Sequence, residues 1–122
     1  MSDLTMGAIE SRFADIIWQQ EPVSSTELVK LAQRELGWKK STTYTVLKKL
    51  SDRGIFTTNE RIVTSLISKE EFYSIQSEQF VNETFQGSLP AFLAAFTARK
   101  VPTAEELAEI KKLMDSLGVE TK

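Results

Sequence analysis

Residues 37–54 read GWKKSTTYTVLKKLSDRG, and this stretch decides the fold. Thr43, Val46, Leu47 and Leu50 recur at steps of three and four, which places them on one face of a helix over residues 41–53. A second amphipathic helix is predicted over residues 25–36, and Gly37 and Gly54 are residues that commonly end helices. Only four residues connect the two helices. Two short helices joined by a tight glycine turn indicate a helix-turn-helix.

Three helix starts share one signature, a hydroxyl residue followed three positions later by Glu. This spacing lets the hydroxyl accept a hydrogen bond from the backbone of the third helical residue, while the Glu reaches back to the cap. The pairs are Ser24 with Glu27, Ser68 with Glu71, and Thr103 with Glu106. An earlier helix, over residues 5–20, is predicted from its apolar periodicity and ends before Pro22.

The pattern changes after Gly54, where two stretches rich in β-branched residues flank a polar turn at residues 59–61. We interpret residues 55–58 and 62–67 as a β-hairpin, and three helices followed by a hairpin make a winged helix. Three further helices are predicted beyond Ser68. The fold class is therefore mainly α with a small β-hairpin: a winged-helix DNA-binding domain over 1–68, then a three-helix dimerisation region over 69–122.

The amino-acid composition excludes several classes of functional site. The 122 residues include no Cys and no His, which excludes disulfides, Cys/His zinc sites, thiol nucleophiles and an imidazole base. No nucleophile elbow or phosphate-binding loop is present, so we predict neither an enzyme nor a need for a metal or cofactor. With no apolar run of about 20 residues and no signal peptide, we expect a cytoplasmic protein that does not insert into membranes.

The net charge of −2 conceals a split between the two halves of the chain. Residues 1–68 carry nine Lys or Arg against eight Asp or Glu, whereas residues 69–122 carry six against nine. Residues 39–53 hold five basic residues against Asp52 alone. Because the local field decides whether phosphates are attracted, this segment favours DNA, although an ordinary solvated helix face would also carry such charges.

The outward face of the 41–53 helix carries the predicted DNA contacts. N-terminal residues of a recognition helix usually reach base edges, and later residues meet the backbone. We predict a small contribution from the wing, where Glu60 accompanies the one basic residue. Tyr44 could equally pack against the first helix. The predicted base or sugar contacts are Ser41, Thr42, Tyr44 and Thr45, and the predicted phosphate contacts are Lys40, Lys48 and Lys49, with Arg61 on the wing.

The predicted tail helices carry an apolar seam that is too extensive for a free appendage. The seam could form an intramolecular core, but three short helices outside a complete winged helix are better buried against a second copy. We therefore predict a homodimer. Its interface residues would be Phe72, Phe85, Leu89, Phe92, Phe96, Leu107, Ile110, Met114 and Leu117.

Several segments, spread along essentially the whole chain, resemble one known family. They are IIW 16–18, STEL 25–28, LGW 36–38, residues 42–54, LISKEEF 66–72, FQGSL 85–89, FLAAF 92–96 and EELAEI 105–110. The chain resembles the penicillinase and methicillin-resistance repressor family. The resemblance implies a homodimer held by the C-terminal helices. It also implies repression at palindromic operators, often with TACA and TGTA halves, in front of resistance or stress genes.

Three departures limit what the resemblance implies. Some members sense copper through C-terminal cysteines, which this chain lacks. Others are inactivated through a membrane sensor-protease system that leads to cleavage between an Asn and a Phe in the middle tail helix. The matching positions are Ala95 and Phe96, so the Phe is present and the Asn is not. The hairpin is also shorter than is usual in the family.

Two functions from different classes fit the sequence. The first is a dimeric repressor that occludes RNA polymerase on its operator. The second is a winged-helix protein-interaction module that has lost DNA binding, which the acidic total charge and the weak wing favour slightly. Sequence-selective, salt-sensitive DNA binding distinguishes the two.

Overall fold

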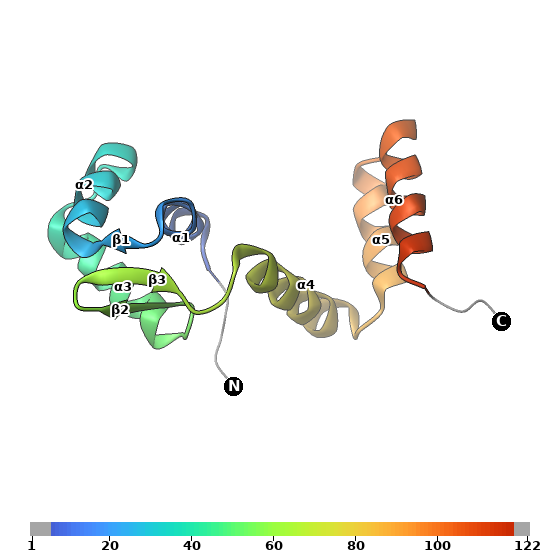
Figure 1. Cartoon of the computed structure of the whole chain (residues 1–122). Coiled ribbons are helices and arrows are strands. Elements are labelled where there is room, and N and C mark those ends of the chain that lie inside the picture. The colour runs from blue at the N-terminus through green and yellow to red at the C-terminus, as the bar shows by residue number, and fades with distance from the viewer. Residues whose placement is uncertain (1–5, 119–122) are drawn as a thin grey trace. The chain divides into compact units, whose positions relative to one another are not determined.

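The computed structural model describes residues 6–118, and Figure 1 shows the order of its helices and strands. Contacts divide the chain into two compact units, Met1–Gln79 and Phe80–Lys122, which are described separately below. Within the described range there are six helices and one small antiparallel sheet. The predicted class, a winged helix-turn-helix followed by C-terminal helices, is confirmed.

Three helices begin the first unit: α1 (Ala8–Gln20), α2 (Ser25–Leu36) and α3 (Lys40–Asp52). The predicted first residue of α1, Thr5, lies outside the described residues. Ser24 caps α2 by accepting a hydrogen bond from the Glu27 backbone at 3.0 Å. Gly37 ends α2 in the left-handed conformation, with φ of 69°. The local signals at 24 and 37 therefore set the bounds of α2 as the sequence predicts.

The sheet has three strands, in the order β1 (Val23–Ser24), β3 (Ile62–Ser65), β2 (Phe56–Asn59). The hairpin of β2 and β3 is confirmed, and β1 adds a strand that the sequence does not predict. Val23 pairs with Val63 across the antiparallel ladder. A strand of two residues is too short to show the alternation by which strands are recognised.

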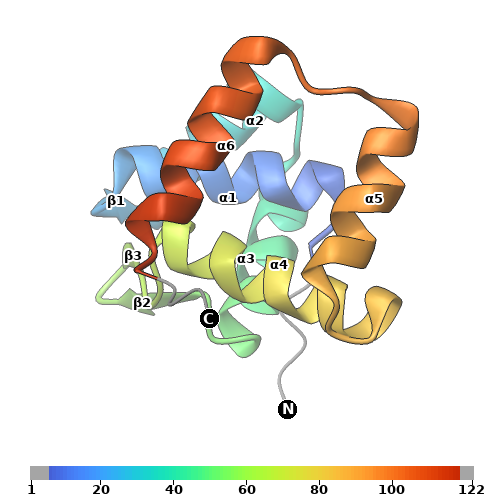
Figure 2. The ribbon, with the colours of Figure 1, turned by 90° about the vertical axis from the view of Figure 1, so that its right-hand side faces the viewer.

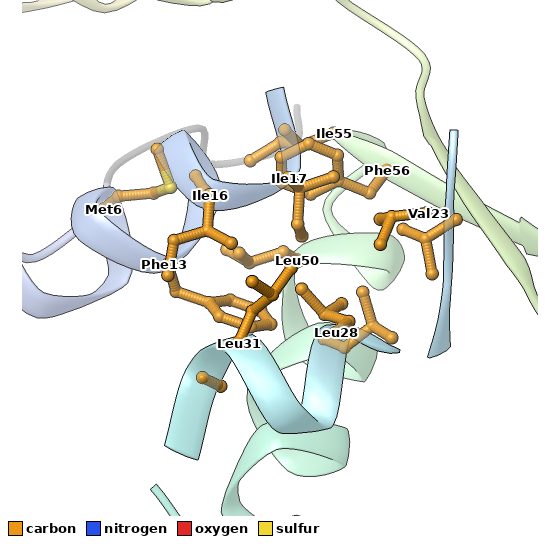
Figure 3. Packing of buried hydrophobic residues seen from close by; sticks show 14 of the residues in the cluster. Met6, Phe13, Ile16, Ile17, Val23, Leu28, Leu31, Leu50, Ile55 and Phe56 are labelled. Atoms are coloured by element: carbon orange, nitrogen blue, oxygen red, sulfur yellow. The ribbon is translucent and has the colours of Figure 1, made fainter. Parts of the chain in front are cut away.

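The core of the first unit lies between its three helices and the sheet (Figure 3). The largest fully buried side chains come from every helix of the winged helix and from its sheet, and they include Phe13, Ile17, Leu28, Leu50 and Phe56. Trp38, in the turn between α2 and α3, packs on Phe13 with ring centroids 5.0 Å apart. The inner face of α3 also belongs to this core. The core therefore fixes the orientation of α3.

The start of α4 (Lys69–Phe85) belongs to the same core. Phe72 is completely buried and its ring centroid lies 5.7 Å from that of Trp18. The Trp18 indole donates to the Ile67 carbonyl at 3.1 Å, and Lys69 pairs with Asp15 at 3.0 Å. The sequence pattern assigns Phe72 to the dimerisation seam. The structure places it inside the first unit instead, where a second subunit cannot reach its side chain.

The second unit contains the last turns of α4, then α5 (Leu89–Arg99) and α6 (Ala104–Ser116). Helices α5 and α6 overlap in the view of Figure 1, but Figure 2 shows that they lie apart and are joined by an extended connection. Ser88 caps α5 through the Ala91 backbone at 3.1 Å. Thr103 and Glu106 form the reciprocal capping box that their spacing predicts for α6. Helix bounds in this unit therefore follow from its caps.

Candidate nucleic-acid interface and the apolar face of the second unit

Helix α3 has one buried and one exposed face. Thr43, Leu47 and Leu50 are buried, as their spacing predicts. Val46 is partly buried against the same core, and the exposed residues include every position on this helix that the sequence assigns to DNA. The exposed residues are Lys40, Ser41, Thr42, Tyr44, Thr45, Lys48 and Lys49. The structure therefore brings these seven side chains to one surface, which we call the α3 face.

The hydroxyl groups of the α3 face are not equivalent. Thr45 donates its hydroxyl hydrogen to the Ser41 carbonyl, one turn earlier, at 2.9 Å. Within the described chain the hydroxyls of Ser41 and Thr42 have no hydrogen-bond partner, so both can donate and accept. Thr43 also bonds back, to the Lys39 carbonyl at 3.1 Å, but it faces the core. The first turn of the α3 face is thus the polar part that is open to a ligand.

The lysines differ in the same way. Lys48 forms an exposed ion pair with Asp52 on the next turn, 3.1 Å between Nζ and Oδ2. Lys49 instead reaches α1, where its Nζ lies 2.9 Å from Glu10 Oε2. Lys40 has no ion-pair partner among the residues that the structure describes. Lys49, predicted as a phosphate contact, therefore already has a partner within the protein.

Glu10 joins the beginning of α1 to the end of α3. Its second carboxylate oxygen accepts from the Gly7 backbone at 3.0 Å. That backbone hydrogen bond, and then Lys49, hold the pKa of Glu10 below its ordinary value. Because the pKa of Glu10 is lowered in the folded protein, its carboxylate stabilises the fold at pH values above the unfolded-state pKa. This stabilisation is lost as the pH falls through the folded-state pKa. No periodicity reveals a pair that is 39 positions apart in sequence.

The wing is held close to α2. Glu60 and Arg61 form the two-residue turn between β2 and β3, and both have positive φ, 50° and 67°. The Arg61 carbonyl accepts a hydrogen bond from the buried Ser25 backbone at 2.8 Å, and the Arg61 residue itself is exposed. Left-handed backbone costs a residue with a side chain about 1–2 kcal/mol. The turn thus holds an arginine where glycine would be less strained.

The second unit exposes large apolar side chains and, among its described residues, buries none. Phe80, Phe85 and Phe92 form a cluster of edge-to-face rings with centroids 5.7–6.0 Å apart. A groove of about 220 Å³ between α5 and α6 is lined by side chains that include Phe96 and Ile110. The exposed apolar residues, which we call the tail face, are Phe80, Leu89, Leu93, Phe96, Val101, Leu107, Ile110, Leu113, Met114 and Leu117.

The tail face contains six of the residues that the sequence assigns to dimerisation: Leu89, Phe96, Leu107, Ile110, Met114 and Leu117. Phe85 and Phe92 are half-buried and form the aromatic cluster with Phe80. The proposed cleavage pair, Ala95 and Phe96, lies in α5 and is exposed. In the described part of the chain, no helix could span a membrane and no acidic cluster could hold a metal ion.

Comparison with known proteins finds one matching family model, described as penicillinase repressor, over residues 6–116. The penicillinase repressor of Bacillus licheniformis is 20% identical over 104 residues, covering 82% of this chain and 81% of that protein. The methicillin resistance regulatory protein MecI of Staphylococcus aureus is 19% identical over 114 residues, covering 90% and 93%. These matches span both structural units.

Proposed function

The chain belongs to the penicillinase repressor family of transcription regulators, and from that premise we propose that it is a homodimeric repressor which places α3 in the major groove of a palindromic operator. The observation that carries the proposal is the α3 face, where hydroxyl and lysine side chains are exposed on the opposite side of a helix anchored in the core. Hydroxyls suit base edges and lysines suit phosphates.

Individual contacts follow from position on the helix. Residues near the N-terminus of a recognition helix meet bases, which assigns that role to Ser41, Thr42, Tyr44 and Thr45. Lys40 and Lys48 would bind phosphates, because Lys40 has no ion-pair partner in the described chain and the ion pair of Lys48 is exposed to solvent. Lys49 would support α3 through Glu10 and not contact DNA directly. Residues 1–68 would thus form the DNA-binding part.

The tail face supports the homodimer. Leu113 and Leu117 are 60% and 64% exposed, and neighbouring positions on α5 and α6 are similarly open. Many large apolar side chains left exposed in one small unit indicate an interaction site, and a second copy of this chain supplies a matching set. Two-fold symmetry would then require operator half-sites about 10 base pairs apart or at multiples of that spacing. Residues 69–122, apart from Phe72, would hold the dimer together.

The proposal includes a route to induction and a target. Cleavage between Ala95 and Phe96, in response to a membrane sensor-protease system, would cut α5 within the proposed interface and release the operator. The regulated gene would be a resistance or stress gene, as the names of the relatives indicate for those proteins.

Selection of bound duplexes from a random DNA pool, followed by a salt titration of the selected sequence, tests the proposal. We expect a palindromic sequence, and an affinity that falls steeply with salt because each neutralised phosphate releases counterions. The selected sequence should occur upstream of a gene in the source genome. If no duplex is enriched and binding at micromolar protein is insensitive to salt, the repressor proposal fails. The protein-interaction module is then the better description.

Lys48→Ala and Lys49→Ala should separate DNA binding from stability. We expect Lys48→Ala to weaken binding to all duplexes and to reduce the slope of log K against log salt by about two, one phosphate per subunit. Lys49→Ala should leave the slope nearly unchanged and lower the free energy of unfolding by about 0.5 kcal/mol, since it removes a partly exposed ion pair. Fluorescence anisotropy and urea titration measure the two quantities. The reverse pattern would contradict our assignment of both lysines.

Arg61→Gly tests the wing. Glycine adopts the left-handed backbone without strain, so the variant should be as stable as the wild type or more stable by up to about 1 kcal/mol. Its affinity for the selected duplex should nevertheless fall, because a cation near the flanking phosphates is lost. Thermal unfolding and anisotropy measure both. If the affinity does not fall, Arg61 does not contact DNA. DNA binding would then not explain why an arginine occupies this left-handed backbone position.

A further inference from the structure

Thr45, in the second turn of α3, has a side-chain hydrogen bond that limits which DNA base it could contact and how. We propose that Thr45 recognises a thymine through its γ-methyl group, and that its hydroxyl does not donate a hydrogen bond to DNA. The inference rests on the proposed function, because it takes α3 to be the reading helix. It goes further by assigning one base and one kind of contact to one side chain.

The first step is the hydrogen bond inside the helix. Thr45 Oγ1 lies 2.9 Å from the Ser41 carbonyl oxygen and donates its single hydrogen to it. A threonine hydroxyl has one donor hydrogen, so Thr45 has none left for a base acceptor. Thr45 is exposed, and apart from this committed hydrogen its side chain can offer a base only the Cγ2 methyl group and the oxygen lone pairs.

The second step is the contrast with neighbouring residues. Ser41 and Thr42 are also exposed, and among the described residues nothing accepts a hydrogen from either hydroxyl. Donation to N7 or O6 of a purine, or to O4 of thymine, is therefore available from the first turn of the α3 face. Next to Thr45, Tyr44 is 40% exposed and presents an aromatic ring. The second turn is thus the less polar part of the surface.

The third step is the chemistry of the major groove. Thymine is the one standard DNA base with a methyl group there, and the methyl of threonine is among the groups that contact it. Burying one methyl group contributes about 0.8 kcal/mol, which corresponds to about fourfold in affinity. The size of the effect is therefore modest per half-site but readily measurable.

Two variants, each of which changes one group of Thr45, and one DNA modification test the proposal. The probe is the duplex selected by the wild-type protein, with each thymine replaced in turn by deoxyuridine, which removes only the methyl group. Thr45→Val replaces the hydroxyl by a methyl and keeps Cγ2, whereas Thr45→Ser keeps the hydroxyl and removes Cγ2. Affinities are measured by anisotropy at one salt concentration, and thermal unfolding confirms that both variants are folded.

We expect one thymine per half-site at which deoxyuridine weakens wild-type binding about fourfold. Thr45→Val should bind within twofold of wild type and keep this sensitivity. Thr45→Ser should bind the thymine duplex about fourfold more weakly per half-site and lose nothing further on the deoxyuridine duplex. This pattern assigns the methyl contact to Thr45, because the loss from the protein and the loss from the DNA are not additive.

Other outcomes overturn the proposal. If Thr45→Val loses more affinity than Thr45→Ser, the hydroxyl is the group that binds DNA. If the wild type binds a selected duplex tightly but no thymine is sensitive to deoxyuridine, the inference fails while the repressor proposal stands. If the wild type selects no duplex at all, both fail together. The wild-type scan needs no variant, so the test does not depend on either substitution being tolerated.

Discussion

Met114→Asp should convert the dimer into monomers and weaken operator binding by a thousandfold or more. Met114 is 54% exposed on α6 within the tail face, so the substitution leaves the packing inside one subunit largely intact. In a dimer it would place an unpaired carboxylate in each half of an apolar interface. The effective penalty for such a buried charge is several kcal/mol per ion, and about 4 kcal/mol corresponds to a thousandfold in a dissociation constant.

Sedimentation velocity across a range of protein concentrations measures the change in assembly. Ala108→Asp is the matched control, because it introduces the same charge on the same helix. Ala108 is exposed two residues before Ile110, and successive helical residues advance by about 100°, so it lies almost opposite the tail face. The control should remain dimeric. A dimeric Met114→Asp, or an equally monomeric Ala108→Asp, would mean that the interface lies elsewhere.

DNA binding by the Met114→Asp monomer should lose about half of the wild-type salt slope, since half of the phosphate contacts are lost. Both tryptophans, Trp18 and Trp38, lie in the first unit. Their fluorescence should therefore be unchanged, which would show that the reading unit remains folded. A monomer that kept the full slope would contradict the proposal that two subunits grip one operator.

Much of the fold could be predicted because its signals are local. The bounds of α2 follow from Ser24 and Gly37, and the start of α6 follows from Thr103 and Glu106. The inner face of α3 follows from the three- and four-residue spacing of its apolar side chains. The family prediction is likewise confirmed by the model match over residues 6–116. Signals contained within one turn or one helix are readable without knowing the tertiary structure.

What could not be predicted depends on contacts between distant segments. Strand β1 exists because Val23 and Ser24 pair with β3, and two residues carry no pattern of their own. The partner of Lys49 is Glu10 on another helix, so a lysine that looks like a phosphate contact in the sequence is already paired in the structure. Phe72 fits the apolar spacing of the tail, yet it faces the core of the first unit. Periodicity identifies an apolar face but not what covers it.

Phe72→Ala should destabilise the first unit by about 3–5 kcal/mol, the usual loss for a fully buried phenylalanine. Phe72 is completely buried, and it lies beside Trp18, which also packs on Phe56 at 5.3 Å between ring centroids. Removing the ring leaves a cavity at the point where α4 joins the winged helix. Small domains have about 5–15 kcal/mol of stability in total, so the urea midpoint followed by tryptophan fluorescence should fall by more than about 1 M.

Phe96→Ala is the informative comparison, because it removes the same ring from the tail face, where Phe96 is 52% exposed. We expect Phe96→Ala to weaken dimerisation, as measured by sedimentation. The urea midpoint followed by tryptophan fluorescence should change little when it is compared at concentrations where the protein is monomeric. Phe72→Ala should show the opposite pattern: a large loss of stability in the first unit at concentrations where the second unit still assembles. If Phe72→Ala instead dissociated the dimer and left the midpoint unchanged, Phe72 would belong to the interface, as its spacing in the sequence suggests. The pair of variants therefore decides whether the start of α4 belongs to the DNA-reading unit or to the interface between subunits.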